Sequence, residues 1–435
     1  NARMKRFLNI LINIAVANTS TFFLWSALSF WLYLETHSVL ILSILSGTFM
    51  TLVTLSGMFF GTIVDKHRKK KVIAVSSVIA IAFLLLAGSV FLIFDRQEIA
   101  DMSSPAFWIF SLSILLSALV SNLRSIALST TVSILVPKED YARANGMVGM
   151  VQGFGMIANT VFSGLVIGKM GLEWAMYITL ILSGLALIHL FFVPIPENHL
   201  HHDPEVLNKQ IDFKGAIKAI RSVPGLMPLI FFTTFNNFIG GIFMVLLDPY
   251  GLEMFSVELW GILLGITGTG FIFGGMAIAK KGLGKKPLRT LLYGYVIASM
   301  ISLLFTVREW AWLFLAGIFL YMFFVPFIEA AEQTIIQTVV PKIKQGRVFG
   351  FAQTVESAAT PISSYLIGPI AQFSIIPFMD SDAGKQVFGW LLGEGNARGI
   401  ALTFVLAGAF MLLLSLLAFR TKAYHRLSES FRKSK

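Results

Sequence analysis

Residues 39–94 read VLILSILSGTFMTLVTLSGMFFGTIVDKHRKKKVIAVSSVIAIAFLLLAGSVFLIF, two long apolar runs joined by a short charged segment from Asp65 to Lys71. A transmembrane α-helix needs about 20 consecutive, mostly apolar residues, and each run is long enough. The stretch therefore predicts two antiparallel membrane helices with a polar turn between them.

The same alternation of apolar run and polar break continues along the whole chain. Charged residues, proline and glycine separate the runs, for example at Pro137–Asp140 and Lys280–Lys286. The sequence predicts an all-α membrane protein with twelve transmembrane helices, at residues 8–34, 39–63, 72–94, 106–135, 143–168, 172–193, 224–247, 257–279, 287–306, 310–338, 347–376 and 398–419.

The composition of the 435 residues excludes a soluble protein. Hydrophobic residues make up 56% of the chain and charged residues 13%, with a mean hydropathy of +0.78. Polar side chains are therefore too few to cover a water-exposed surface. The chain has no cysteine, which excludes disulfides, thiolate catalysis and Cys-ligated metal sites.

The basic residues predict how the chain is oriented. With the N-terminus inside, 28 of the 34 Lys and Arg residues fall in cytoplasmic segments, five fall outside, and Arg124 lies within a span. Cytoplasmic loops of membrane proteins carry an excess of Lys and Arg, so we expect both termini in the cytoplasm. This placement also accounts for the net charge of +11 without a nucleic-acid partner.

The longest central polar stretch, residues 194–223, separates the spans into six and six. We therefore predict an N-terminal six-helix bundle at 1–193, a cytoplasmic linker at 194–223, and a C-terminal six-helix bundle at 224–435 that ends in a basic tail. A short interfacial helix is expected at 211–222, and another on the outer side around Lys385–Leu392.

The two halves share sequence features at matching positions. Val136-Pro137-Lys138, Arg143 and Gly146 recur 204 residues later as Val340-Pro341-Lys342, Arg347 and Gly350. Gly57-Met-Phe-Phe-Gly61 resembles Gly270-Phe-Ile-Phe-Gly274, at an offset of 213 residues. Two matches in the same order, at the same place in each half, indicate two homologous halves in parallel repeat.

The loop after the second span reads Gly61-Thr-Ile-Val-Asp65-Lys66-His67-Arg68-Lys69-Lys70-Lys71. A glycine, an aspartate four residues later and a basic run resemble the signature of the major facilitator superfamily, with Arg68 where a glycine is usual. The counterpart loop, from Gly274 to Lys286, has Ile278 in place of the aspartate. Within the superfamily, residues 136–146 and 346–350 look most like bacterial macrolide- and multidrug-efflux permeases (drug:H⁺ antiporters) and siderophore exporters.

The resemblance implies two homologous six-helix bundles, a central substrate site and alternating access. It also implies a cytoplasmic gate made by Gly61, Asp65, Arg68, Lys69 and Arg347. Gly61 permits close approach of two helices. Asp65, placed near the helix start at Arg347, would hold the cytoplasmic side closed, because a helix N-terminus favours an anion. The alternative is that Asp65 is only a loop charge that sets topology.

Four charged residues fall within predicted spans: Arg124, Glu329, Glu332 and Glu356. A charge at the bilayer centre costs about 2.5–3.5 kcal/mol on insertion scales, so such residues normally face a partner or a water-filled cavity. An apolar environment favours the protonated form of a carboxylic acid, and a nearby arginine favours the charged form. We therefore predict proton coupling at these residues. The alternative is a static salt bridge between Arg124 and one of the glutamates.

Arg124 departs from the pattern that the resemblance would require for a proton-relay arginine. Drug antiporters carry Arg-x-x-Gln-Gly in the fourth helix, whereas this chain reads Arg124-Ser-Ile-Ala-Leu128. The superfamily's arrangement of helices nevertheless implies that Arg124 faces Glu329 and Glu332 across the central cavity.

Amide and aromatic side chains in other spans are the predicted lining of the substrate cavity. Such a lining suits an amphiphilic solute that is neutral or partly cationic. The alternative is ordinary packing, in which amides hydrogen-bond between helices and Phe faces lipid. The predicted lining residues are Asn18, Phe22, Trp25, Asn122, Gln152, Phe235, Asn236, Asn237, Gln333 and Gln337.

Two sequence motifs are missing, and their absence narrows the function. There is no GxxxxGK[ST] nucleotide loop, so ATP is not the direct energy source, and no His-Glu-x-x-His zinc motif. We predict no enzyme activity, no cofactor and no metal.

We expect proton-coupled export of amphiphilic small molecules (drugs, macrolide-like compounds or siderophores) by a monomer in the bacterial cytoplasmic membrane. A lipid or lysolipid translocator and a proton-coupled uptake symporter of the same fold are the alternatives. A membrane sensor or enzyme would need a catalytic set or a large soluble domain, and the longest soluble stretch is 194–223.

Overall fold

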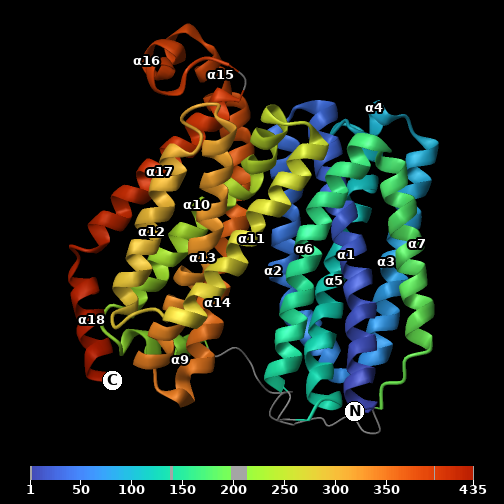
Figure 1. Ribbon diagram of the computed structural model, residues 1–435, viewed down its shortest axis with the longest axis horizontal. Coiled ribbons are helices and arrows are strands. Elements are labelled where there is room, and N and C mark those ends of the chain that lie inside the picture. The colour runs from blue at the N-terminus through green and yellow to red at the C-terminus, as the bar shows by residue number, and fades with distance from the viewer. Residues whose placement is uncertain (1, 138–140, 197–212, 396, 435) are drawn as a thin grey trace. The chain divides into compact units, whose positions relative to one another are not determined.

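The computed structural model describes residues 2–137, 141–196, 213–395 and 397–434 (Figure 1). Every regular element within these ranges is a helix, and they contain no strand. The chain divides into two compact units. Unit 1 comprises Asn1–Asn208 and Phe255–Gly265, and unit 2 comprises Lys209–Met254 and Ile266–Lys435.

Unit 1 is built around its first helix, which packs against three others. The helix α1 contacts α5, α6 and α7, and α3 packs against both α5 and α7. The helices of this unit, which also includes the first part of α11, are α1 (Ala2–Thr36), α2 (Val39–Lys66), α3 (Lys69–Ile93), the short α4 (Arg96–Ile99), α5 (Pro105–Leu135), α6 (Tyr141–Lys169) and α7 (Leu172–Phe191).

Small hydroxyl residues join α1 to its neighbours in unit 1. The Thr21 and Ser121 hydroxyls lie 2.6 Å apart, Thr179 donates to the carbonyl of Ser20 at 3.2 Å, and Ser163 donates to the carbonyl of Phe23 at 3.0 Å. In a bilayer, lipid tails are as apolar as a leucine side chain, so close packing and hydrogen bonds of this kind hold helices together. These contacts explain why α1 is apolar on most sides yet carries a stripe of Ser, Thr and Asn.

Unit 2 contains two closely packed sets of helices. The helix α10 packs mainly against α14, and α12 packs against α13 and α17. The helices of this unit are α9 (Phe213–Arg221), α10 (Leu226–Met254), α11 (Val257–Lys281), α12 (Pro287–Leu304), α13 (Ala311–Val339), α14 (Lys342–Ile370), α15 (Ile376–Asp380), α16 (Asp382–Leu392), α17 (Arg398–Ala418) and α18 (Lys422–Ser434).

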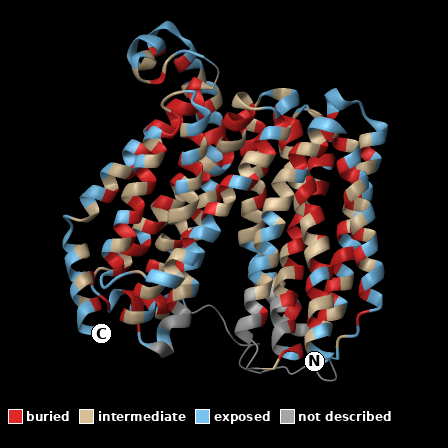
Figure 2. Ribbon diagram, viewed as in Figure 1, coloured by how far each residue is buried: buried red, intermediate tan, exposed pale blue. Residues whose placement is uncertain are grey.

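Twelve of the described helices are long and apolar enough to cross a membrane, which confirms the twelve predicted spans. Each predicted span coincides with one of them. Large apolar side chains also remain exposed along or directly beside these helices, among them Leu92, Phe192 and Trp312. Figure 2 shows stretches of exposed residues along the helices of each unit. A water-soluble protein rarely leaves so many apolar side chains exposed, whereas lipid tails would cover them.

One predicted boundary was wrong. The seventh span was expected to end at residue 247, because Asp248, Pro249 and Glu253 look like a loop. The structure continues α10 through Pro249 to Met254. Proline lacks the N–H that would bond the carbonyl four residues earlier, which disfavours a helix interior. Here the side chains of Tyr250 and Leu252 are buried, and their packing favours the helix.

The two short helices expected outside the spans are present. The helix α9 lies within the predicted 211–222, and α16 covers the predicted Lys385–Leu392. The helix α14 changes into a π-helical turn at Ala371–Ile375, directly after Pro369. The domain boundaries proposed within 194–223 stay a prediction, since residues 197–212 lie outside the described part of the chain.

Candidate functional site

A cavity of about 480 Å³ lies within unit 2, among α10, α12, α13 and α14. Its volume falls in the range of about 300–1,000 Å³ that is usual for small-molecule sites. Its lining is half polar and half apolar, and comprises Thr233, Asn236, Asn237, Gly240, Tyr295, Ala298, Tyr321, Val325, Ile328, Glu329, Glu332, Gln333, Ile336, Phe349, Ala352, Gln353, Glu356, Ser357 and Met411.

Helical spacing explains why α13 contributes three of the polar groups. Glu329, Glu332 and Gln333 lie three and four residues apart, so they share one face of α13. Glu332 is half-buried, whereas Glu329 and Gln333 are exposed to the cavity space. The structure thus brings together all three glutamates that the sequence singled out, because Glu356 of α14 lines the same cavity.

Two of these glutamates are direct neighbours. The carboxyl groups of Glu332 and Glu356 line the same cavity and interact with each other. An ionised carboxylate only accepts hydrogen bonds, so a direct hydrogen bond between the two would require a proton on at least one of them. The pair is therefore a candidate proton-binding site.

The cavity also presents acceptors that lack a donor. The Oε1 atoms of Glu332 and Glu356 and the Oδ1 atom of Asn236 are buried, and none has a hydrogen-bond partner among the described residues. No Lys, Arg or His is among the described residues that line the cavity. Buried polar atoms are usually paired, so this arrangement is ready to accept hydrogen bonds from a proton donor or a cation.

The backbone that carries Glu356 is fixed to α10. Asn237 donates from Nδ2 to the carbonyl of Glu356 at 3.2 Å, and Thr360 donates to the carbonyl of Asn237 at 3.4 Å. One turn further along, Gly241 lies so close to Ser363 and Thr360 that a Cβ atom would overlap both. Only glycine permits this approach, and α10 and α14 consequently form one rigid pair.

A second cavity, of about 220 Å³, adjoins the first. The two share Gly240 and Tyr321, and the second is otherwise lined almost entirely by apolar side chains of α10, α12 and α13 such as Phe243, Leu247 and Phe305. A ligand that spans both would place a polar group beside the carboxyl pair and an apolar group against the phenylalanines.

Arg124 lies in unit 1 and is completely buried. Its Nε donates to Asn18 Oδ1 at 2.8 Å, and its Nη2 donates to the Ser121 hydroxyl at 3.0 Å and, at 3.4 Å, to the Ala17 carbonyl and the Thr21 hydroxyl. All these acceptors are neutral, and its described contacts include no carboxylate. Its predicted role in proton coupling stays a prediction.

The other predicted lining residues take several positions. Asn18 donates to the Ser125 hydroxyl at 3.0 Å beside Arg124. Trp25 stacks on Phe49, with ring centroids 5.2 Å apart, and Phe22 meets the same ring edge-on. Asn122 is half-buried in α5, and Gln152 is exposed on α6.

Two predicted lining residues of unit 2 lie outside the cavity. Phe235 packs against Phe410 of α17, with ring centroids 5.3 Å apart, and does not line the cavity. Gln337 is exposed, one turn beyond Gln333, and also lies outside the lining.

The proposed gate residues are only partly described. The backbones of Gly61, Asp65 and Arg347 belong to α2 and α14, but their side chains lie outside the described residues. Arg68 is exposed at the start of α3, whereas Lys69 is buried and donates from Nζ to the carbonyl of Val64 at 2.7 Å. Lys69 therefore stabilises the turn between α2 and α3, and the gate itself stays a prediction.

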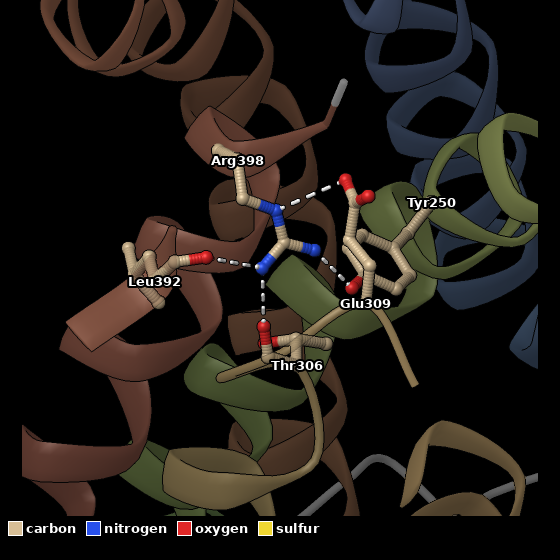
Figure 3. Close-up of polar contacts among 5 residues, drawn as sticks. All are labelled: Tyr250, Thr306, Glu309, Leu392 and Arg398. Carbon is tan, nitrogen blue, oxygen red and sulfur yellow. Dashed lines mark hydrogen bonds and ion pairs between the residues drawn. The ribbon is translucent and has the colours of Figure 1, made fainter. Parts of the chain in front are cut away.

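The sequence analysis missed a polar cluster at the end of unit 2 that carries α16 (Figure 3). Buried Arg398 donates to the carbonyls of Thr306 at 2.8 Å and Leu392 at 3.2 Å and to the Tyr250 hydroxyl. Its Nε lies 3.3 Å from the Glu309 carboxylate. This cluster joins α10, α16, α17 and the segment between α12 and α13, which is a structural role.

Tyr295 and Tyr321, which line the main cavity, were also missed. Each is a tyrosine inside a predicted span, and the hydroxyl of a tyrosine there normally requires a polar partner. The presence of tyrosine within an apolar run could therefore have marked both positions in the sequence.

Most of the chain matches the model of one protein family. A family model described as Major Facilitator Superfamily matches residues 10–364. No curated protein sequence matches the chain.

Solved structures of similar fold cover almost the whole chain. A bacterial homologue of the human lysosomal transporter Spinster, inward-facing and unoccupied, is 14% identical, with a TM-score of 0.65 over 100% of this chain and 98% of that one. A D-xylose–proton symporter is 13% identical (TM-score 0.59, covering 92% and 96%), and the nucleoside transporter NupG is 12% identical (TM-score 0.66, covering 95% and 100%). At these identities the likeness concerns the fold alone.

Proposed function

The chain belongs to the Major Facilitator Superfamily, and from that premise we propose that it is a proton-coupled exporter of amphiphilic small molecules. Drugs, macrolide-like compounds and siderophores are the expected substrates. The protein would act as a monomer in the bacterial cytoplasmic membrane, with both termini inside and without a cofactor. The two bundles would alternate access to a central site.

The observation that carries this proposal is the carboxyl pair of Glu332 and Glu356 in a cavity whose described lining has no basic residue. Two neighbouring carboxyl groups in one cavity can share a proton between them, so such a pair is a site where a proton can be exchanged for a substrate. Two charged carboxylates side by side are unfavourable, so loss of the proton favours either a cation between them or their separation.

The shape of the two adjoining cavities supports an amphiphilic substrate. A head group that donates hydrogen bonds, such as an amine, fits the unpaired oxygens of Glu332, Glu356 and Asn236. An apolar body fits the smaller cavity beside Phe243 and Phe305. Specific polar contacts at one end and apolar surface at the other are the usual composition of a small-molecule site.

The proposed cycle uses these residues in sequence. In the outward state, a proton from outside binds the Glu332–Glu356 pair and displaces the cationic head of the substrate. The protonated pair permits the return to the inward state. Release of the proton inside then leaves the pair ionised and ready to bind the next substrate. Glu329, one turn away on α13, offers a third carboxyl that lines the same cavity.

A lysolipid translocator is the second candidate, because a single alkyl chain also fits the apolar cavity of about 220 Å³. Uptake by proton symport has the same requirements for a carboxyl pair, and one of the similar structures is a D-xylose–proton symporter. The direction of transport and the substrate therefore both need to be measured.

The test is ethidium efflux from energised cells or everted vesicles, with and without a protonophore. Wild type is compared with Glu332→Gln/Glu356→Gln, and with Glu98→Gln/Glu394→Gln as a control that removes two exposed carboxylates outside the cavity. Efflux that the protonophore and the cavity variant both abolish, while the control retains it, supports the proposal. Efflux that persists in the cavity variant removes the carboxyl pair from the mechanism. If wild type moves no dye under a proton gradient, lysolipid becomes the substrate to test.

A further inference from the structure

A second polar cavity, of about 440 Å³, lies in unit 2 between the start of α12 and the amphipathic α18. Figure 1 shows α18 at the same end of this unit as α9. The lining includes four basic residues, Lys285, Lys286, Arg289 and Arg432, and one acidic residue, Glu429, together with Pro287, Leu288, Tyr424, His425, Ser428 and Phe431.

The four cations are available to a ligand. All four are exposed, and none forms an ion pair with another described residue. Arg289 is held in place by its Nε, which donates to the Tyr293 hydroxyl at 3.0 Å, and its guanidinium lies over that ring, 5.3 Å from the centroid. The cavity therefore has an uncompensated positive charge of about three, which attracts an anion.

An apolar groove of about 260 Å³ continues from this cavity. The two share Leu288 and Tyr424, and the groove runs on between α12, α17 and α18 along Leu292, Leu414 and Leu417. The groove has almost no polar surface.

The position of cavity and groove matches the boundary of the membrane. The α12 span begins at Pro287, directly after Lys285 and Lys286, and the α17 span ends at Ala418. Lys285, Lys286 and Arg432 thus lie just outside the spans and Arg289 lies in the first turn of α12, on the side that the Lys and Arg distribution predicts to be cytoplasmic, while the groove lies along the ends of the spans. A phospholipid has its phosphate and its acyl chains at these same two depths.

The helix α18 that closes the cavity is firmly packed. Leu427 and Phe431 are buried against the core of unit 2. Gly225, with φ of +86°, lies so close to Ala423 and Leu427 that a side chain there would collide with α18. The cavity is therefore a fixed feature of the fold and not a gap beside a loose tail.

We propose that this basic cavity and its groove form a binding site for one anionic phospholipid of the cytoplasmic leaflet. The phosphate is bound by Lys285, Lys286 and Arg432, and an acyl chain lies in the groove along Leu292 and Leu417. Positive charge beside an apolar groove at the membrane boundary matches the two ends of such a lipid. A soluble phosphate would use only the cations and leave the groove empty.

The experiment uses the full-length protein purified in detergent and native mass spectrometry with dioleoyl-phosphatidylglycerol or dioleoyl-phosphatidylcholine. The variant Lys285→Gln/Lys286→Gln/Arg432→Gln is compared with Lys422→Gln/Arg426→Gln/Lys433→Gln, which removes three exposed cations of α18 that do not line the cavity. The first triple variant should weaken phosphatidylglycerol binding about 100-fold, or about 3 kcal/mol for three cations, and the control less than about threefold.

A second variant tests the groove without changing charge. Ala418→Trp fills it and should weaken phosphatidylglycerol binding about tenfold while the cations remain; this also keeps the test decisive if the triple variant does not fold. Equal binding of the two lipids, equal loss in both triple variants, or undiminished binding to Ala418→Trp overturns the proposal. Displacement of the lipid by millimolar inorganic phosphate would identify a soluble anion as the ligand instead.

Discussion

Replacement of Glu332 by Gln should uncouple transport from the proton gradient and leave exchange of substrate intact. Gln has the size of a protonated glutamate, and its amide N–H can donate to Glu356 in place of a proton shared by the pair. The variant therefore retains the contact between α13 and α14 but has no proton to release there.

The magnitude follows from the number of protons that the pair holds. One proton shared by the pair corresponds to one proton per cycle. At zero membrane potential, one proton exchanged for one substrate molecule supplies about 1.36 kcal/mol per pH unit, which supports a substrate gradient of about tenfold. Participation of Glu329 as a second proton site would raise this limit to about 100-fold for the same pH difference.

Proteoliposomes with the membrane potential clamped at zero measure this directly. With a pH difference of one unit, wild type should concentrate the substrate about tenfold, and Glu332→Gln should bring it only to equal concentrations on both sides. Exchange of labelled for unlabelled substrate at equal pH should continue in the variant within about threefold of the wild-type rate. The control Glu98→Gln, an exposed carboxylate of α4, should retain the tenfold gradient. A tenfold gradient in Glu332→Gln would refute the reasoning, because the proton would then have to bind elsewhere.

Three further predictions concern stability and the role of Arg124. Arg398→Met leaves two carbonyls and the Tyr250 hydroxyl without their donor, so it should lower the free energy of unfolding by about 2–4 kcal/mol, measured by thermal unfolding in detergent. The control Glu309→Gln should lower it by less than about 1 kcal/mol, since that carboxylate is 43% exposed. Gly241→Val must displace Ser363 and should destabilise by about 2 kcal/mol or more, while Gly268→Ala, which meets no atom within 4 Å, should change stability by less than about 0.5 kcal/mol; equal effects would mean that the α10–α14 contact is not tight. Arg124→Met removes a buried charge but leaves neutral acceptors unpaired, so stability should change by less than about 2 kcal/mol, and efflux should fall at least tenfold; wild-type efflux would show that Arg124 has no part in coupling.

The sequence predicted the helices well because a membrane span depends on a local property, the length of an apolar run. It failed at Pro249, where burial of Tyr250 extends α10 beyond the polar residues that appeared to end it. Local signals cannot reveal which side chains from distant segments pack together, and that is why the α10 boundary was missed.

The site was predicted only in part, because which side chains meet in the cavity depends on the packing of distant segments. Intramembrane charge identified Glu332 and Glu356 separately, but only the packing of α13 beside α14 makes them a pair. Phe235 and Asn236 were both expected in the cavity, yet neighbours on a helix point about 100° apart, so Asn236 lines it and Phe235 packs against α17. Which of the two faces the cavity depends on how α10 is rotated, and that is set by its contact with α14.

The place of the carboxyl pair between two helix pairs explains how a proton could change the conformation of unit 2. The helix α13 packs mainly against α12, and α14 packs mainly against α10, so the carboxyl pair of Glu332 and Glu356 lies where one pair of helices meets the other. Two ionised carboxylates at a separation of about 4 Å repel by about 4 kcal/mol at a dielectric constant of about 20, which exceeds the roughly 1.36 kcal/mol that one proton supplies per pH unit. A proton or a cationic head group removes that repulsion in the same place, and both cannot occupy it together. Proton binding and substrate binding would therefore exclude each other, which is the condition for exchange of one for the other.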